Sequence, residues 1–197
     1  MVDRAPGLRE RRRARTLQTI REHAMRLFLE RGYDATTVSE VAEAAEVSSM
    51  TVFRYFPTKE DLVLADEYDP LILERITERP SDEPLLLRLG NGLITAYEQL
   101  TAQEQEVLLR RVRLCLSTPA LRARLWDSQY TTQQAITEAL CGASDDPEHR
   151  FRVWVSAGVC LSAVSAALVR WAEEDARPSM GDLMRQVLTI VAEESSG

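Results

Sequence analysis

The chain contains a single lysine, Lys59, among 24 basic residues, and aromatic residues make up only 6% of its 197 positions. It has three cysteines and no Cys-x-x-Cys pair. Cysteines so few and so far apart exclude a disulfide framework. We therefore expect Cys115, Cys141 and Cys160 to be buried free thiols of a protein that stays in the reducing cytoplasm.

Patterns typical of strands and of several enzyme classes are also missing. Alternating runs of β-branched residues are almost absent, whereas Ala, Leu, Glu and Arg, which favour helices, are abundant. There is no His-Glu-x-x-His motif, no Gly-x-Gly-x-x-Gly motif and no phosphate-binding glycine loop. The two histidines, His23 and His149, show no metal-ligand spacing. We expect an all-α protein that is not an enzyme and uses no metal or cofactor.

Helix start and stop signals divide the chain into about nine helices. Gly32 is a stop signal, and proline follows Thr118 and Asp146 at two helix starts. Four capping boxes mark further starts: Thr37/Glu40, Thr58/Asp61, Thr101/Glu104 and Ser179/Asp182. The predicted helices span 9–31, 37–44, 48–55, 58–78 with a kink at Asp69-Pro70, 83–99, 102–116, 119–141, 147–175 and 180–194.

Residues 153–169 carry no charge and approach the lower length limit for a membrane span. They are bracketed by Arg152 and Arg170 and are rich in Ser, Ala and Gly. A helix buried on two faces of a soluble protein has the same composition, and we favour that interpretation.

Charge is distributed unevenly along the chain. The net charge is −7, yet residues 1–60 carry 11 basic and 9 acidic side chains, and the first fifteen residues include six arginines. A basic head joined to an acidic body indicates a small polyanion-binding domain attached to a second module.

Residues 37–56 fit a helix-turn-helix. A short helix, TVSEVAEAA, is followed by a tight turn, EVS, and a second short helix, SSMTVFRYF. In this motif the second helix enters the DNA major groove, and its N-terminal residues reach base edges. We expect Val52, Phe53 and Phe56 to face inward as apolar anchors. The residues left for the outer face are Ser48, Ser49, Met50, Thr51, Arg54 and Tyr55.

Phosphate contacts are expected on both sides of this second helix. Lys59 follows the cap residue Thr58, and an ammonium group beside free helix N–H groups forms a phosphate clamp. The amide end of the helix at Thr37 could do the same, and the Tyr55 hydroxyl suits a contact at the groove edge. A hairpin of helices or a lone lysine is often merely structural or solvated. The order of these features within sixty residues favours DNA binding.

The stretch TIREHAMRLFLERGYDATTVSEVAEAAEVSSMTVFRYFPTKEDLVLA resembles the DNA-binding domain of TetR-family transcriptional regulators. The resemblance covers residues 12–72. It implies an all-helical homodimer with a three-helix head and a body of about six helices, most members being repressors released by a small molecule. It also implies DNA contacts at Thr37 and residues 48–55, with Tyr55 and Lys59 on phosphates.

The chain departs from the family pattern in two places. Glu46 stands where the turn usually has glycine, so a positive φ there would cost about 1 kcal/mol. Met50 and Phe53 stand where the recognition helix of the family usually has glycine and tyrosine. The base preference of other family members therefore cannot be transferred to this chain. The segment FRYFPTKEDLVLADEYDP also resembles the actinobacterial branch that includes mycofactocin-type regulators, some of which sense acyl-CoA thioesters.

These observations predict a DNA-binding domain over 1–57, with a basic arm over 1–15, and a ligand-binding and dimerisation domain over 58–197. Helices 147–175 and 180–194 are expected to pair with their mates, because the first is apolar nearly all round. A monomer with a central helix is the alternative. The candidates for lining a ligand pocket are Tyr97, Cys115, Trp126 and Trp154.

The resulting hypothesis is a cytoplasmic repressor that binds a palindromic operator as a homodimer. A small molecule, an acyl-CoA or another hydrophobic metabolite, would release it. A ligand-independent or architectural DNA-binding protein is the alternative. Residues 4–15 are expected to be flexible without DNA and to enter an adjacent minor groove on DNA, with a solubilising tail as the alternative.

Overall fold

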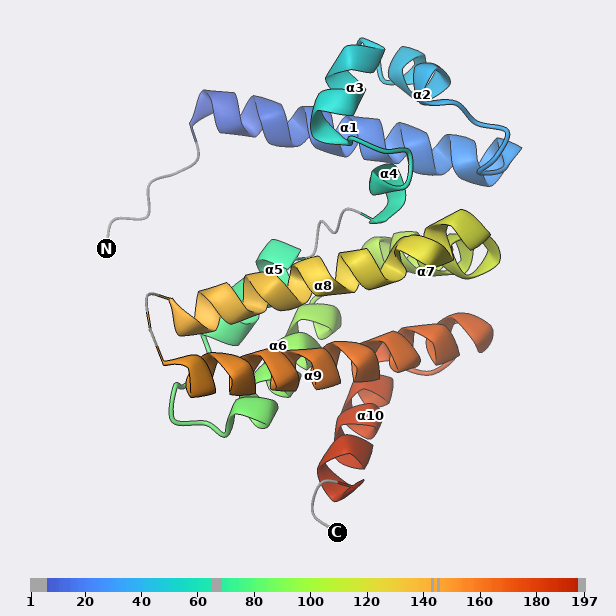
Figure 1. The fold of residues 1–197 in the computed structure, drawn as a ribbon. Helices are drawn as coiled ribbons and strands as arrows, with labels where there is room; N and C mark the ends of the chain where they lie inside the picture. Colours follow the sequence, from blue (N-terminus) through green and yellow to red (C-terminus); the bar gives the residue numbers. More distant parts are fainter. Residues whose placement is uncertain (1–6, 65–68, 143, 145, 195–197) are drawn as a thin grey trace. The chain divides into compact units, whose positions relative to one another are not determined.

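The computed structural model describes residues 7–64, 69–142, 144 and 146–194 (Figure 1). Within these residues there are ten helices and no strand, which confirms the all-α prediction. The helices are α1 (Leu8–Arg31), α2 (Val38–Ala44), α3 (Ser49–Tyr55), α4 (Asp61–Leu64), α5 (Asp69–Thr77), α6 (Leu85–Glu98), α7 (Ala102–Ser117), α8 (Pro119–Cys141), α9 (Pro147–Glu173) and α10 (Met180–Glu194).

The chain divides into two compact units. The head unit comprises residues 1–65 and 117–124, and the body unit comprises residues 66–116 and 125–197. The first turns of α8 therefore belong to the head unit, where Leu121 is fully buried. The predicted boundary between a DNA-binding and a ligand-binding domain after residue 57 concerns function, and it stays a prediction.

The head unit is built on the apolar stripe of α1. Ile20, Ala24, Leu27 and Phe28 recur at helical spacing and are all buried. Contacts of α1 with α2 and α4, and of α2 with α3, close the unit. The buried residues that these shorter helices supply are Val41, Ala42, Val52, Leu62 and Val63.

The predicted helix starts are confirmed by their hydrogen bonds. At Thr37, Thr58 and Thr101 the hydroxyl accepts from the backbone N–H three residues later, and the acid there accepts from the threonine N–H. The Asp146 carboxylate accepts from two N–H groups in the first turn of α9, whose first residue is a proline. These contacts satisfy N–H groups that a helix start leaves without partners.

The turn between α2 and α3 has the positive φ that the sequence suggested. Glu46 has φ of 54°, the conformation usually given to glycine after a helix. The N–H groups of Glu46 and Val47 bond back to the carbonyls of Glu43 and Ala42. This Schellman arrangement sets the sharp angle between the two helices, and the Glu46 side chain remains exposed.

The start of α1 corrects the expectation of a flexible arm. Residues 1–6 lie outside the described part of the chain, but from Leu8 onward the predicted arm is helical. Arginine and leucine favour helix, and no glycine or proline interrupts residues 8–31. The hydroxyls of Thr16 and Thr19 bond to the carbonyls of Arg12 and Arg15 within this helix.

The long helix predicted over 58–78 is also corrected. The structure has two helices there, α4 and α5, and residues 65–68 between them lie outside the described residues. Pro70 occupies the first turn of α5 instead of a kink. Proline fits a first turn because the N–H it lacks has no partner there in any helix.

In the body unit, α6 is the central helix, in contact with α5, α9 and α10. Two glycines allow these close approaches. A Cβ on Gly92 would lie 2.6 Å from Ile76 Cγ1 and 2.9 Å from the Cα of Ile76, so the backbones of α5 and α6 nearly touch. A Cβ on Gly90 would lie 2.7 Å from a terminal methyl of Leu188.

In the described residues, α9 is the one helix long and apolar enough to cross a membrane, by length and composition alone. Core helices of soluble proteins pass the same test. Its buried residues Ala157, Cys160 and Val164 belong to the body core, where α9 contacts α6 and α10. All three cysteines are buried free thiols, as predicted, and burial raises the pKa of the Cys160 thiol to about 12.

The crossing of α5 and α6 gives a stability prediction. We expect Gly92→Ala to destabilise the body by about 1–3 kcal/mol, because backbone atoms of Ile76 cannot move aside as a side chain can. Gly90→Ala is the matched control. There the added methyl meets a rotatable leucine tip, and the gain in helix propensity of about 1 kcal/mol offsets the crowding. Urea unfolding of both variants measures the difference, and equal losses would contradict the close approach.

Candidate functional site

Helix α3 presents one buried side and one exposed side. Val52 and Phe56 are buried, and the Ser48 hydroxyl caps the helix by accepting from the Thr51 N–H at 3.1 Å. The expectation that Phe53 also faces inward is wrong, since its side chain is 47% exposed. Positions 52 and 56 lie four residues apart on one face, and position 53 is turned about 100° away from the first of them.

The exposed side of α3 carries the residues predicted to meet DNA. Met50, in the first turn, is 78% exposed. Ser48 and Arg54 are exposed, while Ser49, Thr51 and Tyr55 are half-buried. The structure thus brings all six together on or beside one short helix, with Phe53 added to them.

Two arginines lie close to the Tyr55 ring. The Arg54 guanidinium is 4.8 Å from the centre of the Tyr55 ring and donates to its hydroxyl at 3.3 Å. The Arg13 guanidinium, from α1, is 5.7 Å from the same ring centre. This cation–π contact places the arginine-rich start of α1 beside α3.

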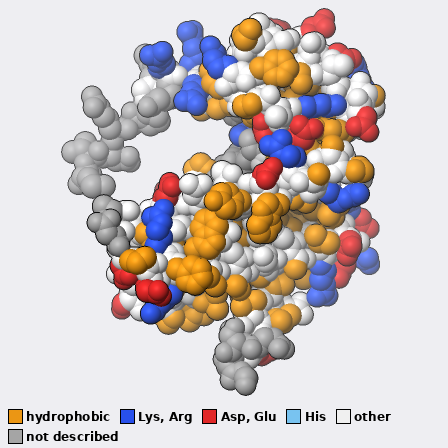
Figure 2. Space-filling view, in the orientation of Figure 1, with side chains coloured by type: hydrophobic (Ala, Val, Ile, Leu, Met, Phe, Trp, Pro, Cys, Tyr) orange, Lys and Arg blue, Asp and Glu red, His pale blue; other side chains and the backbone are white. Residues whose placement is uncertain are grey.

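The start of α1 is the most basic part of the head unit. Figure 2 shows Lys and Arg side chains gathered over it. The arginines are exposed: Arg9, Arg11, Arg12, Arg13 and Arg15. The role of Arg13 was missed from the sequence, although a signal existed. It precedes Leu17 by four residues and Ile20 by seven, so it continues the apolar stripe that faces the other head helices.

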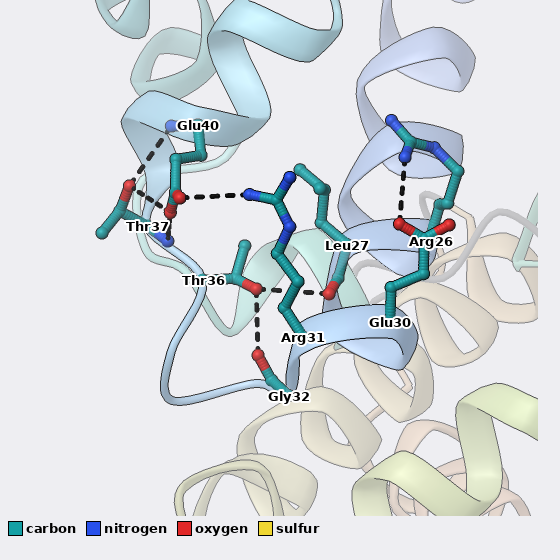
Figure 3. Close-up of polar contacts among 8 residues, drawn as sticks. All are labelled: Arg26, Leu27, Glu30, Arg31, Gly32, Thr36, Thr37 and Glu40. Atoms are coloured by element: carbon teal, nitrogen blue, oxygen red, sulfur yellow. Dashed lines mark hydrogen bonds and ion pairs between the residues drawn. The ribbon is translucent and has the colours of Figure 1, made fainter.

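Thr37 is exposed at the start of α2, but its polar groups are already used (Figure 3). Its N–H donates to Glu40 Oε2 at 2.7 Å and its hydroxyl donates to the same oxygen at 2.9 Å. Arg31 donates to the other carboxylate oxygen at 3.3 Å. The backbone N–H of Thr37 and its hydroxyl lower the pKa of Glu40, so this carboxylate stays ionised and occupies the position predicted for a phosphate.

Lys59 does not extend freely into solvent. It is half-buried, donates to the carbonyl oxygen of Tyr33, and lies 4.2 Å from the Tyr33 ring centre and 5.7 Å from that of Phe28. Burial raises the pKa of Tyr33, and its hydroxyl donates to Glu60 at 2.9 Å, which raises it further. Lys59 thereby ties the start of the next helix to the loop after α1.

The four candidate ligand residues do not come together. Tyr97 is buried in the body core, and Cys115 is also buried. Trp126 is 70% exposed, and Trp154 lines an open groove between α8 and α9. In the described part of the chain, no group of three His, Cys, Asp or Glu side chains is placed to hold a metal ion.

Comparison with known proteins matches both parts of the chain. The family described as bacterial regulatory proteins, tetR family, matches residues 20–65. The MftR C-terminal domain matches residues 83–196, which is more than half of the chain.

Individual proteins agree with these matches. The regulator TcmR of Streptomyces glaucescens is 34% identical over 60% of this chain and 55% of its own length, so the match spans about half of that protein. The mycofactocin biosynthesis regulator MftR of Mycobacterium tuberculosis is 25% identical over 78% of this chain and 80% of its own. The structure of Thermus thermophilus FadR with lauroyl-CoA has a TM-score of 0.53 at 24% identity, covering 90% of this chain and 93% of that one. The chain therefore belongs to the TetR family of bacterial transcriptional regulators and carries a C-terminal domain of the MftR type.

Proposed function

We propose that this protein is a cytoplasmic repressor that binds a palindromic operator as a homodimer and leaves it when a small molecule binds the body. It would act by binding alone, without catalysis. The observation that carries the proposal is the exposed side of α3, on which Met50, Phe53 and Arg54 stand beside a basic helix start. An apolar and cationic surface of this kind suits base edges and phosphates together.

The proposed DNA contacts divide into two classes. Met50, Phe53 and Arg54 occupy exposed positions on α3 and would face base edges, where apolar side chains contact the thymine methyl and arginine reads guanine. Tyr55 and Arg13 would face phosphates. Ser48, Ser49 and Thr51 would contact DNA around the start of α3. Thr37 and Lys59 already have protein partners, so they would bind phosphate only by sharing or exchanging those contacts.

A homodimer is proposed through α9 and α10. The exposed apolar side chains Phe151, Val155 and Val159 recur every four residues along one side of α9, and Ile190 is exposed on α10. Apolar stripes of this kind are typical of surfaces that another helix covers. Two-fold pairing would present two α3 helices to successive major grooves about 34–36 Å apart.

The proposed effector is an acyl-CoA or another hydrophobic metabolite. Support comes from the Thermus thermophilus FadR structure, which is in complex with lauroyl-CoA. The effector would act by favouring a conformation with weaker DNA affinity, and linkage requires DNA to weaken effector binding by the same factor.

The DNA contacts are tested by comparing two arginines of α1. Arg13→Gln should weaken binding to all DNA sequences alike and lower the slope of log affinity against log salt by about 1, because a phosphate contact is lost. Arg26→Gln is the control, since Arg26 is paired with Glu30. Met50→Ala should alter base preference with the slope unchanged. Fluorescence anisotropy on an operator selected from random DNA measures both, and equal behaviour of the two arginine variants would refute the assignment.

The dimer is tested with a carboxylate placed on each of two exposed valines. Val155→Asp should weaken dimerisation by at least about 100-fold, because an unpaired charge buried in an interface costs several kcal/mol. Val107→Asp on α7, an exposed position outside the proposed interface, should leave it unchanged. Sedimentation velocity over a range of concentrations measures this. A monomeric parent, or an unaffected Val155→Asp dimer, would contradict the proposed interface.

The effector response is tested by adding acyl-CoA thioesters of increasing chain length to the operator complex. Lauroyl-CoA should release DNA at concentrations at which CoA does not, because the acyl chain supplies the apolar area that drives binding. If no thioester and no other hydrophobic metabolite changes DNA affinity, the ligand-independent alternative is supported instead.

A further inference from the structure

An open groove lies between α8 and α9 on the body unit. Its volume is about 440 Å³, within the usual range for small-molecule sites. Figure 2 shows hydrophobic side chains gathered on this part of the body. The residues that line it are Tyr130, Gln134, Thr137, Pro147, Arg150, Phe151 and Trp154.

Three aromatic side chains form the apolar part of the groove. The rings of Tyr130 and Trp154 pack edge to face, with centres 5.2 Å apart. Phe151 also belongs to the α9 stripe proposed for the dimer, so the ring left open to a ligand is that of Tyr130, which is 48% exposed. Such a face left open to water suits a flat apolar molecule, which could stack on one ring and meet the edge of another.

Arg150 supplies the only charge among the lining residues. Within the described residues it forms no ion pair, whereas Arg110, Arg113 and Arg170 of the body are paired with Glu106, Asp175 and Glu174. Two of the other polar side chains already have partners: Gln134 donates to Glu138 at 3.3 Å, and the Thr137 hydroxyl donates to the carbonyl of Gln133. An anion in the groove would therefore meet a planar cation with its donors available.

The groove walls are held in fixed register. The Gln133 side chain, on α8, donates to the carbonyl oxygen of Trp154, on α9, at 2.8 Å. Gln129 donates to Ser162 at 3.2 Å further along the same two helices. Gly158 lies against Gln133, because a Cβ there would be 2.9 Å from its amide nitrogen. These contacts preorganise the site, so little ordering is needed when a ligand enters.

We propose that this groove binds a planar aromatic anion, with the ring system against Trp154 and Tyr130 and the anionic group on Arg150. The proposal names a binding site and a chemical class for an effector. Any effect of this ligand on DNA binding rests on the proposed function. A planar aromatic anion can be either an aromatic carboxylate or a nucleotide. The test uses one probe of each kind.

Binding is measured by calorimetry on the purified protein without DNA, using 2-naphthoate and AMP as probes and 2-naphthalenemethanol as the uncharged analogue. We expect at least one anion to bind, and Arg150→Gln to weaken it about tenfold, as loss of a charge-assisted hydrogen bond would. If 2-naphthalenemethanol binds, Arg150→Gln should change its affinity less than twofold, because this probe carries no charge. Trp154→Leu should weaken every probe that binds, because the ring contact is common to them.

Arg152→Gln and Trp126→Leu are the matched controls. Both side chains are exposed and neither lines the groove, so neither change should alter probe binding. The proposal is overturned if neither anion binds at millimolar concentration, or if Arg152→Gln weakens the anion as much as Arg150→Gln. It is also overturned if Trp154→Leu changes the oligomeric state and leaves probe binding intact, since the groove is then a contact between protein chains. A failure here leaves the operator experiments unaffected, so the two proposals are tested separately.

Discussion

Burial of Val52 and Phe56 is the constraint on which the proposed DNA-binding surface depends. A helix of seven residues has little stability of its own. Each fully buried apolar side chain contributes about 1.5–3 kcal/mol, so these two anchors and the Ser48 cap hold α3 in place. Because the anchors lie on one face, they also decide which residues remain outside. The identity of the exposed side is thus a consequence of packing inside the head.

The helix starts show what can be predicted from sequence. Thr37 bonds to Glu40, and Asp146 accepts from the N–H groups of Glu148 and His149. These contacts span four residues or fewer, so they form whatever the rest of the fold does. Contacts between distant residues are different. Lys59 finds its partner 26 positions earlier, at Tyr33, and nothing in the stretch around Lys59 indicates that ring. A cation near a helix start therefore resembled a phosphate clamp until the loop after α1 was placed beside it.

The errors have equally specific causes. The size and apolar character of Phe53 predict that it faces inward, but a short helix has room for one buried stripe, and Val52 with Phe56 fills it. A proline within a long helix predicts a bend, because it lacks an N–H and clashes with the preceding turn, but here a new helix starts at Asp69 and Pro70 lies in its first turn. The candidate effector residues were chosen by type alone, and type does not distinguish Tyr97 in the core from Trp126 on the surface. The groove at Trp154 arises only when α8 and α9 lie against each other.

The near absence of lysine has a chemical consequence. Acetylation removes the charge of a lysine amine, whereas an arginine guanidinium keeps its charge at any physiological pH. Every basic side chain at the start of α1 and on α3 is arginine, so amine-directed modification cannot neutralise this surface. The chain's one lysine, Lys59, lies outside these two helices; its ammonium group donates to the Tyr33 carbonyl and lies against two aromatic rings. Acylation of Lys59 would disturb its contacts with Tyr33 and Phe28 inside the head. The charge of the arginine surface on α1 and α3 would be unchanged.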